Sequence, residues 1–194
     1  MKTNQLKKYA LILGAAILLQ GCAAVVGTTV AVATKVATDP RTVGTQIDDE
    51  TLEEKILFAI NKDQQLKTEA RINVVSYSGQ VLLIGQVPNH NLKELATQLT
   101  EGVEGTKKIY NEIRLGKKIP FTQISKDSWI TTQIKTKIFT TSTGVKATDV
   151  KVITENNEVF LMGNLTQQQA DAATEIARRV SGVSKVVKVF NYLN

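Results

Sequence analysis

The side chains that most enzymes use for catalysis are scarce in this sequence. His90 is the only histidine and Cys22 the only cysteine in a chain of 194 residues. A serine or cysteine nucleophile needs a neighbouring base, and a zinc site needs a cluster of histidines and cysteines. Neither set can be assembled, and no glycine-rich phosphate loop is present. We therefore expect no catalysis, no small-molecule substrate, no cofactor and no metal, and we interpret His90 as an exposed turn residue.

A basic stretch around the only tryptophan has the residue types that bind an anionic membrane surface. Ile130, Ile134 and Ile138 recur at every fourth position, which predicts the buried stripe of a helix. An indole is well placed at the level of lipid headgroups, and each cation near anionic lipid contributes about 1 kcal/mol. The candidate lipid-binding residues lie off the stripe, on an adjoining face: Lys126, Trp129, Thr132, Gln133, Thr136 and Lys137.

A packing role for Trp129 explains the same pattern equally well from the residues alone. In that alternative the indole fills a gap against the linker or a neighbouring domain, where its N–H finds a partner. Phe121 and Ile124 precede the basic stretch, and they either extend the apolar footprint or pack in a core. The residue pattern leaves these alternatives open.

The N-terminal segment has the order of an export signal. Three lysines precede an apolar run, and the small residue Gly21 stands just before Cys22. The run has about 11 apolar residues, which is too few to cross a bilayer because a spanning helix needs roughly 20. We therefore expect residues 1–21 to be a signal peptide rather than a transmembrane anchor.

The order Leu19-Gln20-Gly21-Cys22 resembles the lipobox of bacterial lipoproteins. This resemblance implies that the chain is cut before Cys22 and that the thiol is diacylated. Two or more acyl chains, such as palmitate, anchor a protein stably where a single chain does not. Residue 23 is alanine rather than aspartate, which in such lipoproteins implies export to the outer membrane, with the globular part facing the periplasm.

Residues 22–47 are expected to form the lipidated N-terminus and a tether. The segment is small and apolar, contains glycines and Pro40, and lacks a helical period. A short helix from Val25 to Lys35 is an alternative that the β-branched residues disfavour. Because the segment is too apolar for a well-solvated linker, we expect part of it to pack on a domain.

The rest of the chain is an internal repeat. Val74–Gly85 aligns with Val152–Gly163 at an offset of 78 residues, with valine, leucine and glycine in register. We therefore predict an α+β protein of two tandem αββαβ modules, residues 48–116 and 117–194. Each copy has its own core stripes, so the second is expected to fold without the first.

The hydrophobic period also places the elements within each copy. Asp127 is predicted as the N-cap of the basic helix, and Gly85 and Gly163 are expected to free the exit turn of the second strand. The first helix is predicted through Leu52, Ile56 and Ile60 in one copy and through the three isoleucines above in the other. The hairpins are predicted at 71–84, turning at Ser78-Gly79, and at 150–162, turning at Asn156-Asn157. The second helices are predicted through 92–99 and 170–180, and the closing strands at 106–115 and 184–193.

The hairpin ending in Val-x-Leu-x-Gly, the helix after it and the glycine turn into a closing strand resemble the BON domain, a small αββαβ module. Two such modules behind a lipobox, with Thr38–Gln46 in the tether and Ser181-Gly182-Val183 near the end, are similar to the DolP family of dual-BON outer-membrane lipoproteins of Gram-negative bacteria. The resemblance implies binding of anionic phospholipid through the first helix of the second module, where Trp129 falls. It also implies enrichment at the division septum and support of outer-membrane integrity.

The two copies differ most in charge. Residues 48–116 contain 8 basic and 11 acidic residues, a net charge of −3, whereas residues 117–194 contain 11 and 6, a net charge of +5. Basic proteins favour nucleic acid or anionic membranes. An exported chain has no routine access to nucleic acid, so we expect anionic phospholipid to be the partner of the second module.

Two functions of different classes therefore stay open. One is a module that binds anionic phospholipid. The other is a periplasmic scaffold for the outer-membrane protein assembly machinery, with the acidic first module or the hairpins docking another envelope protein. Binding to anionic vesicles that weakens with salt is expected only for the first.

Overall fold

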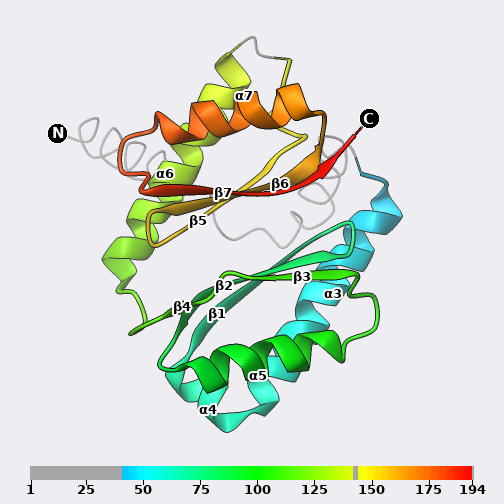
Figure 1. Cartoon of the computed structure of the whole chain (residues 1–194), viewed down its shortest axis with the longest axis vertical. Coiled ribbons are helices and arrows are strands. Elements are labelled where there is room, and N and C mark those ends of the chain that lie inside the picture. Colours follow the sequence, from blue (N-terminus) through cyan, green and yellow to red (C-terminus); the bar gives the residue numbers. More distant parts are fainter. Residues whose placement is uncertain (1–40, 142–143, 194) are drawn as a thin grey trace, which may run out of the picture. The chain divides into compact units, whose positions relative to one another are not determined.

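Helices and strands follow the same order twice along the chain (Figure 1). The computed structural model describes residues 41–141 and 144–193, so the predicted signal peptide, Cys22 and most of the predicted tether lie outside the described residues. The elements are α3 (Val43–Lys62), α4 (Gln64–Glu69), β1 (Arg71–Tyr77), β2 (Gln80–Val87), α5 (His90–Glu101), β3 (Lys108–Asn111), β4 (Arg114–Leu115), α6 (Phe121–Thr140), β5 (Lys151–Glu155), β6 (Glu158–Leu165), α7 (Gln167–Arg178) and β7 (Lys185–Tyr192). The predicted α+β class and the helix, strand, strand, helix, strand order are confirmed, and the short helix α4 is an addition that the sequence pattern did not predict.

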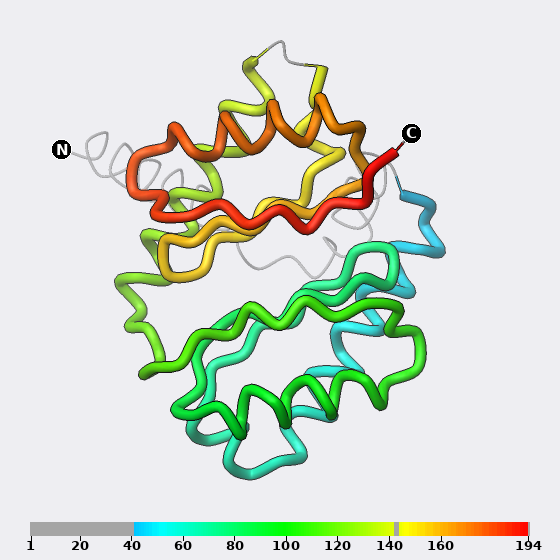
Figure 2. Tube along the Cα trace, in the orientation of Figure 1, coloured from blue at the N-terminus to red at the C-terminus, as the bar shows by residue number. Residues whose placement is uncertain are grey.

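Each module forms a sheet in which the closing segment of the chain pairs parallel with the second strand of a hairpin, and the chain trace in Figure 2 shows the path of both modules. In the first module β1 pairs antiparallel with β2, and β3 and β4 pair parallel with β2. In the second module β5 pairs antiparallel with β6, and β7 pairs parallel with β6. Helices α5 and α7 make the connections that parallel pairing requires.

Both hairpins turn at the predicted residues. Ser78 and Gly79 have φ values of +55° and +80°, and Asn156 and Asn157 have +50° and +64°. Positive φ at both central positions is typical of a type I′ turn, which suits the twist of an antiparallel pair. Asparagine and glycine adopt this conformation readily, so local chemistry accounts for both turns.

A buried aspartate ties the first helix of each module to its hairpin turn. Asp49 accepts hydrogen bonds from the backbone N–H groups of Ser78 and Gly79, at 2.7 and 2.9 Å. Asp127 accepts in the same way from Asn156 and Asn157, at 2.7 and 2.9 Å. The prediction that Asp127 is an N-cap is therefore wrong: α6 begins earlier, after Pro120, and uses no side-chain cap.

The first helix of the other module also begins earlier than its hydrophobic stripe suggested. Helix α3 starts at Val43, inside the segment predicted as tether, and its N-cap Thr42 accepts a hydrogen bond from the N–H of Thr45. The stripe of Leu52, Ile56 and Ile60 is buried as predicted. The extra turns before it are held by this cap and by the bonds that Asp49 makes.

Gly85 and Gly163 lie inside β2 and β6 rather than at an exit turn. A Cβ at Gly85 would stand 1.9 Å from the carbonyl oxygen of Arg71, and one at Gly163 would stand 2.4 Å from that of Asp149. Both glycines are therefore required by close approach of the neighbouring backbone. The expectation that they free the exit turn is wrong.

The closing strand of the first module is interrupted, although the second module has a continuous one. The side-chain oxygen of Asn111 accepts from the N–H of Ile113, and its amide nitrogen donates to the Lys93 carbonyl and the Thr97 hydroxyl. Asn111 thereby turns the chain so that Ile113 is buried between β3 and β4. The predicted single strand 106–115 is two short strands.

Each module has a hydrophobic core between its helices and one face of its sheet. The other faces of the two sheets share a third buried cluster, made of Val75, Tyr77, Leu82 and Ile84 with Phe160, Met162 and Val189. Arg71 donates to Glu155 at 2.5 Å beside this cluster, and Lys151 pairs with Glu53 at 2.9 Å. The second module thus has a core of its own, but without the first it would expose one apolar sheet face.

Acid is expected to weaken the contact between the modules through Glu158. Arg114 donates to Glu158 at 3.0 and 2.6 Å, which holds the pKa of Glu158 below its ordinary value of 4.5. A carboxyl whose pKa is lowered by folding stabilises the fold above its unfolded pKa, and this contribution is lost as pH falls through the lower folded pKa. Below about pH 4.5 the free energy of unfolding, measured with urea, should therefore fall less steeply with decreasing pH in Glu158→Gln than in the parent chain.

The matched control for this test is Glu175→Gln. Glu175 pairs with Arg179 at 2.8 Å at the exposed C-terminal end of α7, and its side chain is half exposed. Exposed pairs of this kind contribute little, so this variant should keep the acid dependence of the parent. Identical acid dependence in Glu158→Gln and the parent would show that the Arg114 contact does not stabilise the fold.

Candidate functional site on helix α6

Helix α6 has an inner stripe that is fully buried in the second module. Ile130, Ile134 and Ile138 are each no more than 1% exposed, and Asp127, three residues before Ile130, accepts hydrogen bonds from the hairpin turn. The predicted core stripe is confirmed. A helix of 20 residues is about 30 Å long, so its opposite side forms a long outer face.

Three large aromatic side chains lie on this outer face. Phe121 is 79% exposed, Trp129 is 64% exposed and Phe139 is 80% exposed. Phe121 and Phe139 are separated by about five helical turns and so point the same way, and Trp129 lies about 80° round the helix from both. Large apolar side chains with this much exposure, aligned on the side opposite the core, are typical of an interaction surface.

The charged residues of α6 that reach solvent are all lysines. Lys126, Lys135 and Lys137 are exposed, and the helix has a single carboxylate, the buried Asp127. None of these lysines forms an ion pair within the described part of the chain. Lys126 and Lys137 flank the aromatic face on one side and Lys135 flanks it on the other. The outer face therefore has aromatic and hydroxyl side chains along its middle and lysines along both edges.

Four hydroxyl groups of the outer face donate hydrogen bonds inside the helix. Four side chains donate to the carbonyl one turn earlier, at 3.0 to 3.1 Å: Ser125, Ser128, Thr132 and Thr140. Burying a polar group is costly when it has no hydrogen-bond partner. Because these donors are already paired, the face can leave bulk water at a lower cost than four free hydroxyls would impose.

The structure places the predicted site residues together on α6. Lys126, Trp129, Thr132, Thr136 and Lys137 are exposed on the helix. Gln133 is half-buried at the edge of the face. The alternative in which the Trp129 indole fills a gap is not favoured, because most of its surface remains exposed.

The two residues thought to extend the footprint behave differently. Phe121 is the first residue of α6 and lies on the outer face. Ile124 is half-buried and lines a cavity of about 330 Å³ with Arg71 and Thr131. Phe139 is the residue that sequence reasoning missed, although its spacing of five turns from Phe121 would have placed it on the same face.

The described ranges contain neither a cluster of metal ligands nor a helix that could span a membrane. Residues 41–141 and 144–193 contain no group of three or more His, Cys, Asp or Glu side chains placed to hold a metal ion. In the same ranges no helix has both the length and the apolar character needed to cross a bilayer.

Comparison with known proteins identifies the two modules. The BON domain model matches residues 48–117 and 126–194. The outer membrane lipoprotein DolP of Haemophilus influenzae is 62% identical over 194 residues, which cover all of both chains. The chain belongs to the DolP family of dual-BON lipoproteins. It is an outer-membrane lipoprotein, as expected from the sequence.

Two further relatives match this chain over most of their length. A protein named 21 kDa hemolysin from Actinobacillus pleuropneumoniae is 61% identical over 155 residues, covering 80% of this chain and 79% of its own. Osmotically-inducible protein Y of Escherichia coli is 30% identical over 155 residues, covering 78% of this chain and 76% of its own.

Proposed function

We propose that this lipoprotein is non-catalytic and binds anionic phospholipid through the outer face of α6, supporting outer-membrane integrity and gathering at division sites. The observation that carries the proposal is the alignment of Phe121, Trp129 and Phe139 on one side of α6, opposite its buried stripe. Aromatic side chains are favoured at the membrane interface, where their rings lie among the headgroups.

The charges along the edges of this face support the choice of anionic lipid. Lys126 and Lys137 on one side and Lys135 on the other would lie beside the headgroups when the aromatic side chains enter the interface. Three cations at about 1 kcal/mol each favour anionic over zwitterionic lipid by roughly 3 kcal/mol, or more than a hundredfold, at low salt. The paired hydroxyls lower the cost of burying the face between them.

Flotation with vesicles tests the proposal. The mature chain, made without its signal segment and with Cys22→Ser so that no acyl chain contributes, is mixed with zwitterionic vesicles or with vesicles containing phosphatidylglycerol. We expect flotation only with the anionic vesicles, and we expect it to fall as salt rises from 0.05 to about 0.5 M because the ions screen surface charges. Equal flotation with both vesicle types, or none with either, would contradict the proposal.

Lipidation and the α6 face are expected to act separately. In cells, Cys22→Ser should leave a folded protein that is lost from outer-membrane fractions after a salt wash, because acyl chains give anchoring that one interfacial helix does not. Retention of the variant in washed outer membranes would contradict lipid anchoring at Cys22. Trp129→Ala should instead remain in the washed membranes, which makes it the matched control.

A further inference from the structure

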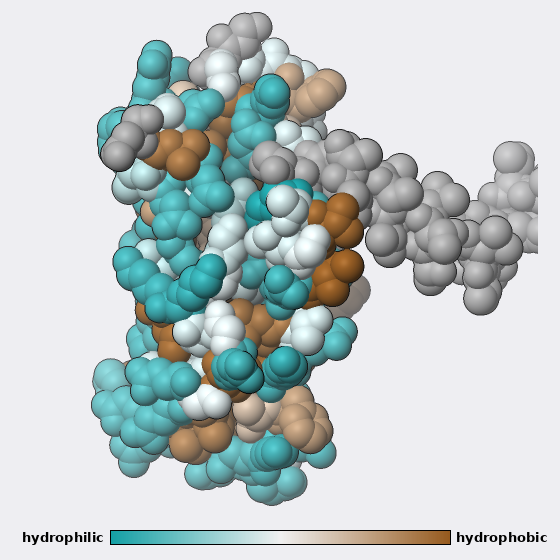
Figure 3. All heavy atoms as spheres, turned by 90° about the vertical axis from the view of Figure 1, so that its right-hand side faces the viewer, coloured by the Kyte–Doolittle hydropathy of each residue, from teal (hydrophilic) through white to brown (hydrophobic). Residues whose placement is uncertain are grey.

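Helix α3 occupies in the first module the place that α6 occupies in the second, and it also has an exposed apolar face. Val43 is 48% exposed, Ile47 is 56% exposed and Phe58 is 66% exposed. At about 100° per residue these three side chains lie on the side opposite the buried stripe. We define the α3 outer face as Val43, Ile47, Glu54 and Phe58. The side of the molecule that carries α3 faces the viewer in Figure 3, where brown apolar surface lies among teal hydrophilic surface.

The charge of this face is opposite to that of α6. Asp48 and Glu54 are exposed on α3. Neither forms an ion pair within the described part of the chain. Lys62 lies over the ring of Phe58 at 4.7 Å, so one edge of the face carries a cation. The first module as a whole has a net charge of −3, which disfavours an anionic membrane and favours a cationic partner.

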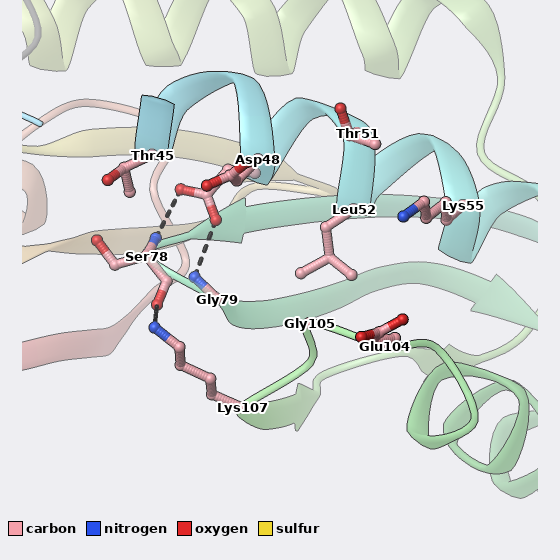
Figure 4. Close-up of a pocket in the computed structure, with 11 residues that line it drawn as sticks. Thr45, Asp48, Thr51, Leu52, Lys55, Ser78, Gly79, Glu104, Gly105 and Lys107 are labelled. Carbon is pink, nitrogen blue, oxygen red and sulfur yellow. Dashed lines mark hydrogen bonds between the residues drawn. The ribbon is translucent and has the colours of Figure 1, made fainter. Parts of the chain in front are cut away.

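A groove beside the α3 outer face presents two exposed carboxylates, together with two lysines. Figure 4 looks into this groove, where Thr45, Asp48 and Thr51 come from α3 and Leu52 points toward Gly105. Its volume is about 330 Å³. Glu104 lines the opposite wall, is exposed and forms no ion pair within the described residues, whereas Lys107 is held at the Ser78 carbonyl, at 3.3 Å.

The groove suits one long basic side chain. Its floor at Leu52 is apolar, and its rim carries the carboxylates of Asp48 and Glu104 and the hydroxyls of Thr45 and Thr51. The exposed Lys55 of α3 also lines the rim, so a basic side chain is bound only where it reaches the two carboxylates. Lysine and arginine pack their methylene stems against apolar surface while their charged ends stay in contact with water or polar groups. Thr51 joins the groove to the α3 outer face, so one partner can occupy both.

We infer that the α3 outer face and this groove bind a cationic amphipathic helix of another protein. The apolar side of that helix packs on Val43, Ile47 and Phe58, and one of its basic side chains enters the groove between Asp48 and Glu104. The two modules then bind partners of opposite charge. The basic α6 faces lipid, and the acidic α3 faces a protein.

A synthetic helical peptide serves as the probe. It has about 18 residues, or five turns, of leucine and lysine arranged with one apolar face, and a second peptide of the same composition has a scrambled order. Fluorescence anisotropy measures binding of each peptide to the mature Cys22→Ser chain without lipid. We expect the patterned peptide to bind at least about tenfold more tightly than the scrambled one, because only it presents a continuous apolar stripe.

Matched variants locate the peptide on the molecule. Phe58→Ser and Glu54→Lys should each weaken binding of the patterned peptide about tenfold, and neither should change flotation with anionic vesicles. Phe139→Ser should weaken flotation and leave peptide binding within about twofold, because Phe139 lies on α6. Glu101→Lys makes the same charge change on α5 and should leave peptide binding within about twofold.

The crossed design separates this inference from the lipid proposal. If Glu101→Lys weakens the peptide as much as Glu54→Lys does, the peptide follows net charge and the inference is wrong. If Phe58→Ser weakens flotation, α3 faces the membrane and the inference is also wrong. If the chain self-associates in sedimentation and both Phe58→Ser and Trp129→Ala abolish this, the occupant of α3 is α6 of a second copy, which overturns the assignment to another protein.

Discussion

Trp129→Ala is expected to weaken binding to anionic vesicles by about tenfold to a hundredfold, because a large buried side chain contributes about 1.5–3 kcal/mol. The indole is 64% exposed in the free protein, so its truncation removes little packing inside the fold. Vesicle flotation as a function of lipid concentration measures the loss. Thermal unfolding followed by circular dichroism should give nearly the parent melting temperature.

The combined variant Phe121→Ser, Trp129→Ser and Phe139→Ser should abolish flotation while the protein stays folded. Its matched control is Phe58→Ser, which removes an aromatic side chain of similar exposure from α3. Lys137→Glu should act in the same direction as Trp129→Ala, and its effect should shrink as salt screens the surface. A drop in stability of several kcal/mol in Trp129→Ala would contradict this account, because a loss of that size is typical of a core aromatic.

Asp127→Ala is expected to lower the free energy of unfolding by about 3 kcal/mol or more. The side chain is 3% exposed and accepts from the N–H groups of Asn156 and Asn157 at 2.7 and 2.9 Å. Hydrogen bonds to a charged group contribute about 1.5–3 kcal/mol each, and the alanine leaves both turn N–H groups without this acceptor. Urea unfolding measured by circular dichroism gives the change.

Two variants control for this result. Asp127→Asn keeps an oxygen that can accept one of the bonds, so we expect its free energy of unfolding to lie between those of the parent and the alanine variant. Asp171→Ala removes an exposed aspartate from α7 and should leave the free energy of unfolding nearly unchanged. Equal stability of Asp127→Ala and the parent would show that the hairpin turn does not depend on the helix carboxylate.

The repeat predicted the fold because periodicity is a property of the sequence itself. The stripe of Ile130, Ile134 and Ile138 and the paired turns at Ser78-Gly79 and Asn156-Asn157 all lie where the patterns placed them. Each of these features depends on neighbours a few residues away. Local chemistry therefore determines them, and a single copy would have been enough to predict each one.

Contacts between distant residues were harder to predict. Asp127 has the chemistry of a good N-cap, and only the position of the Asn156-Asn157 turn gives it another use. Gly85 likewise faces the carbonyl of Arg71, which lies on the neighbouring strand. A propensity describes a residue in its own segment, so it does not reveal a partner brought close by the fold.

The sheet-to-sheet contact did leave a signal in the sequence. Val81–Ile84 and Val159–Met162 are unbroken apolar runs, whereas a strand with one solvated face alternates apolar and polar residues. Such runs predict sheets that are covered on both faces, as the cluster containing Leu82 and Phe160 shows. The candidate site predicted on α6 included Trp129 but not Phe139, because the prediction extended the outer face only as far as Lys137.

The fluorescence of Trp129 tests the central claim most directly, because it is the only tryptophan in the chain and lies on the outer face of α6. Vesicles are added to the mature Cys22→Ser chain, and the emission maximum is followed. Entry of the indole among lipid headgroups should shift the emission to shorter wavelength with anionic vesicles, less so in high salt, and not with zwitterionic vesicles. Unchanged emission while the protein floats with anionic vesicles would contradict the account, because the protein would then be binding lipid through another surface.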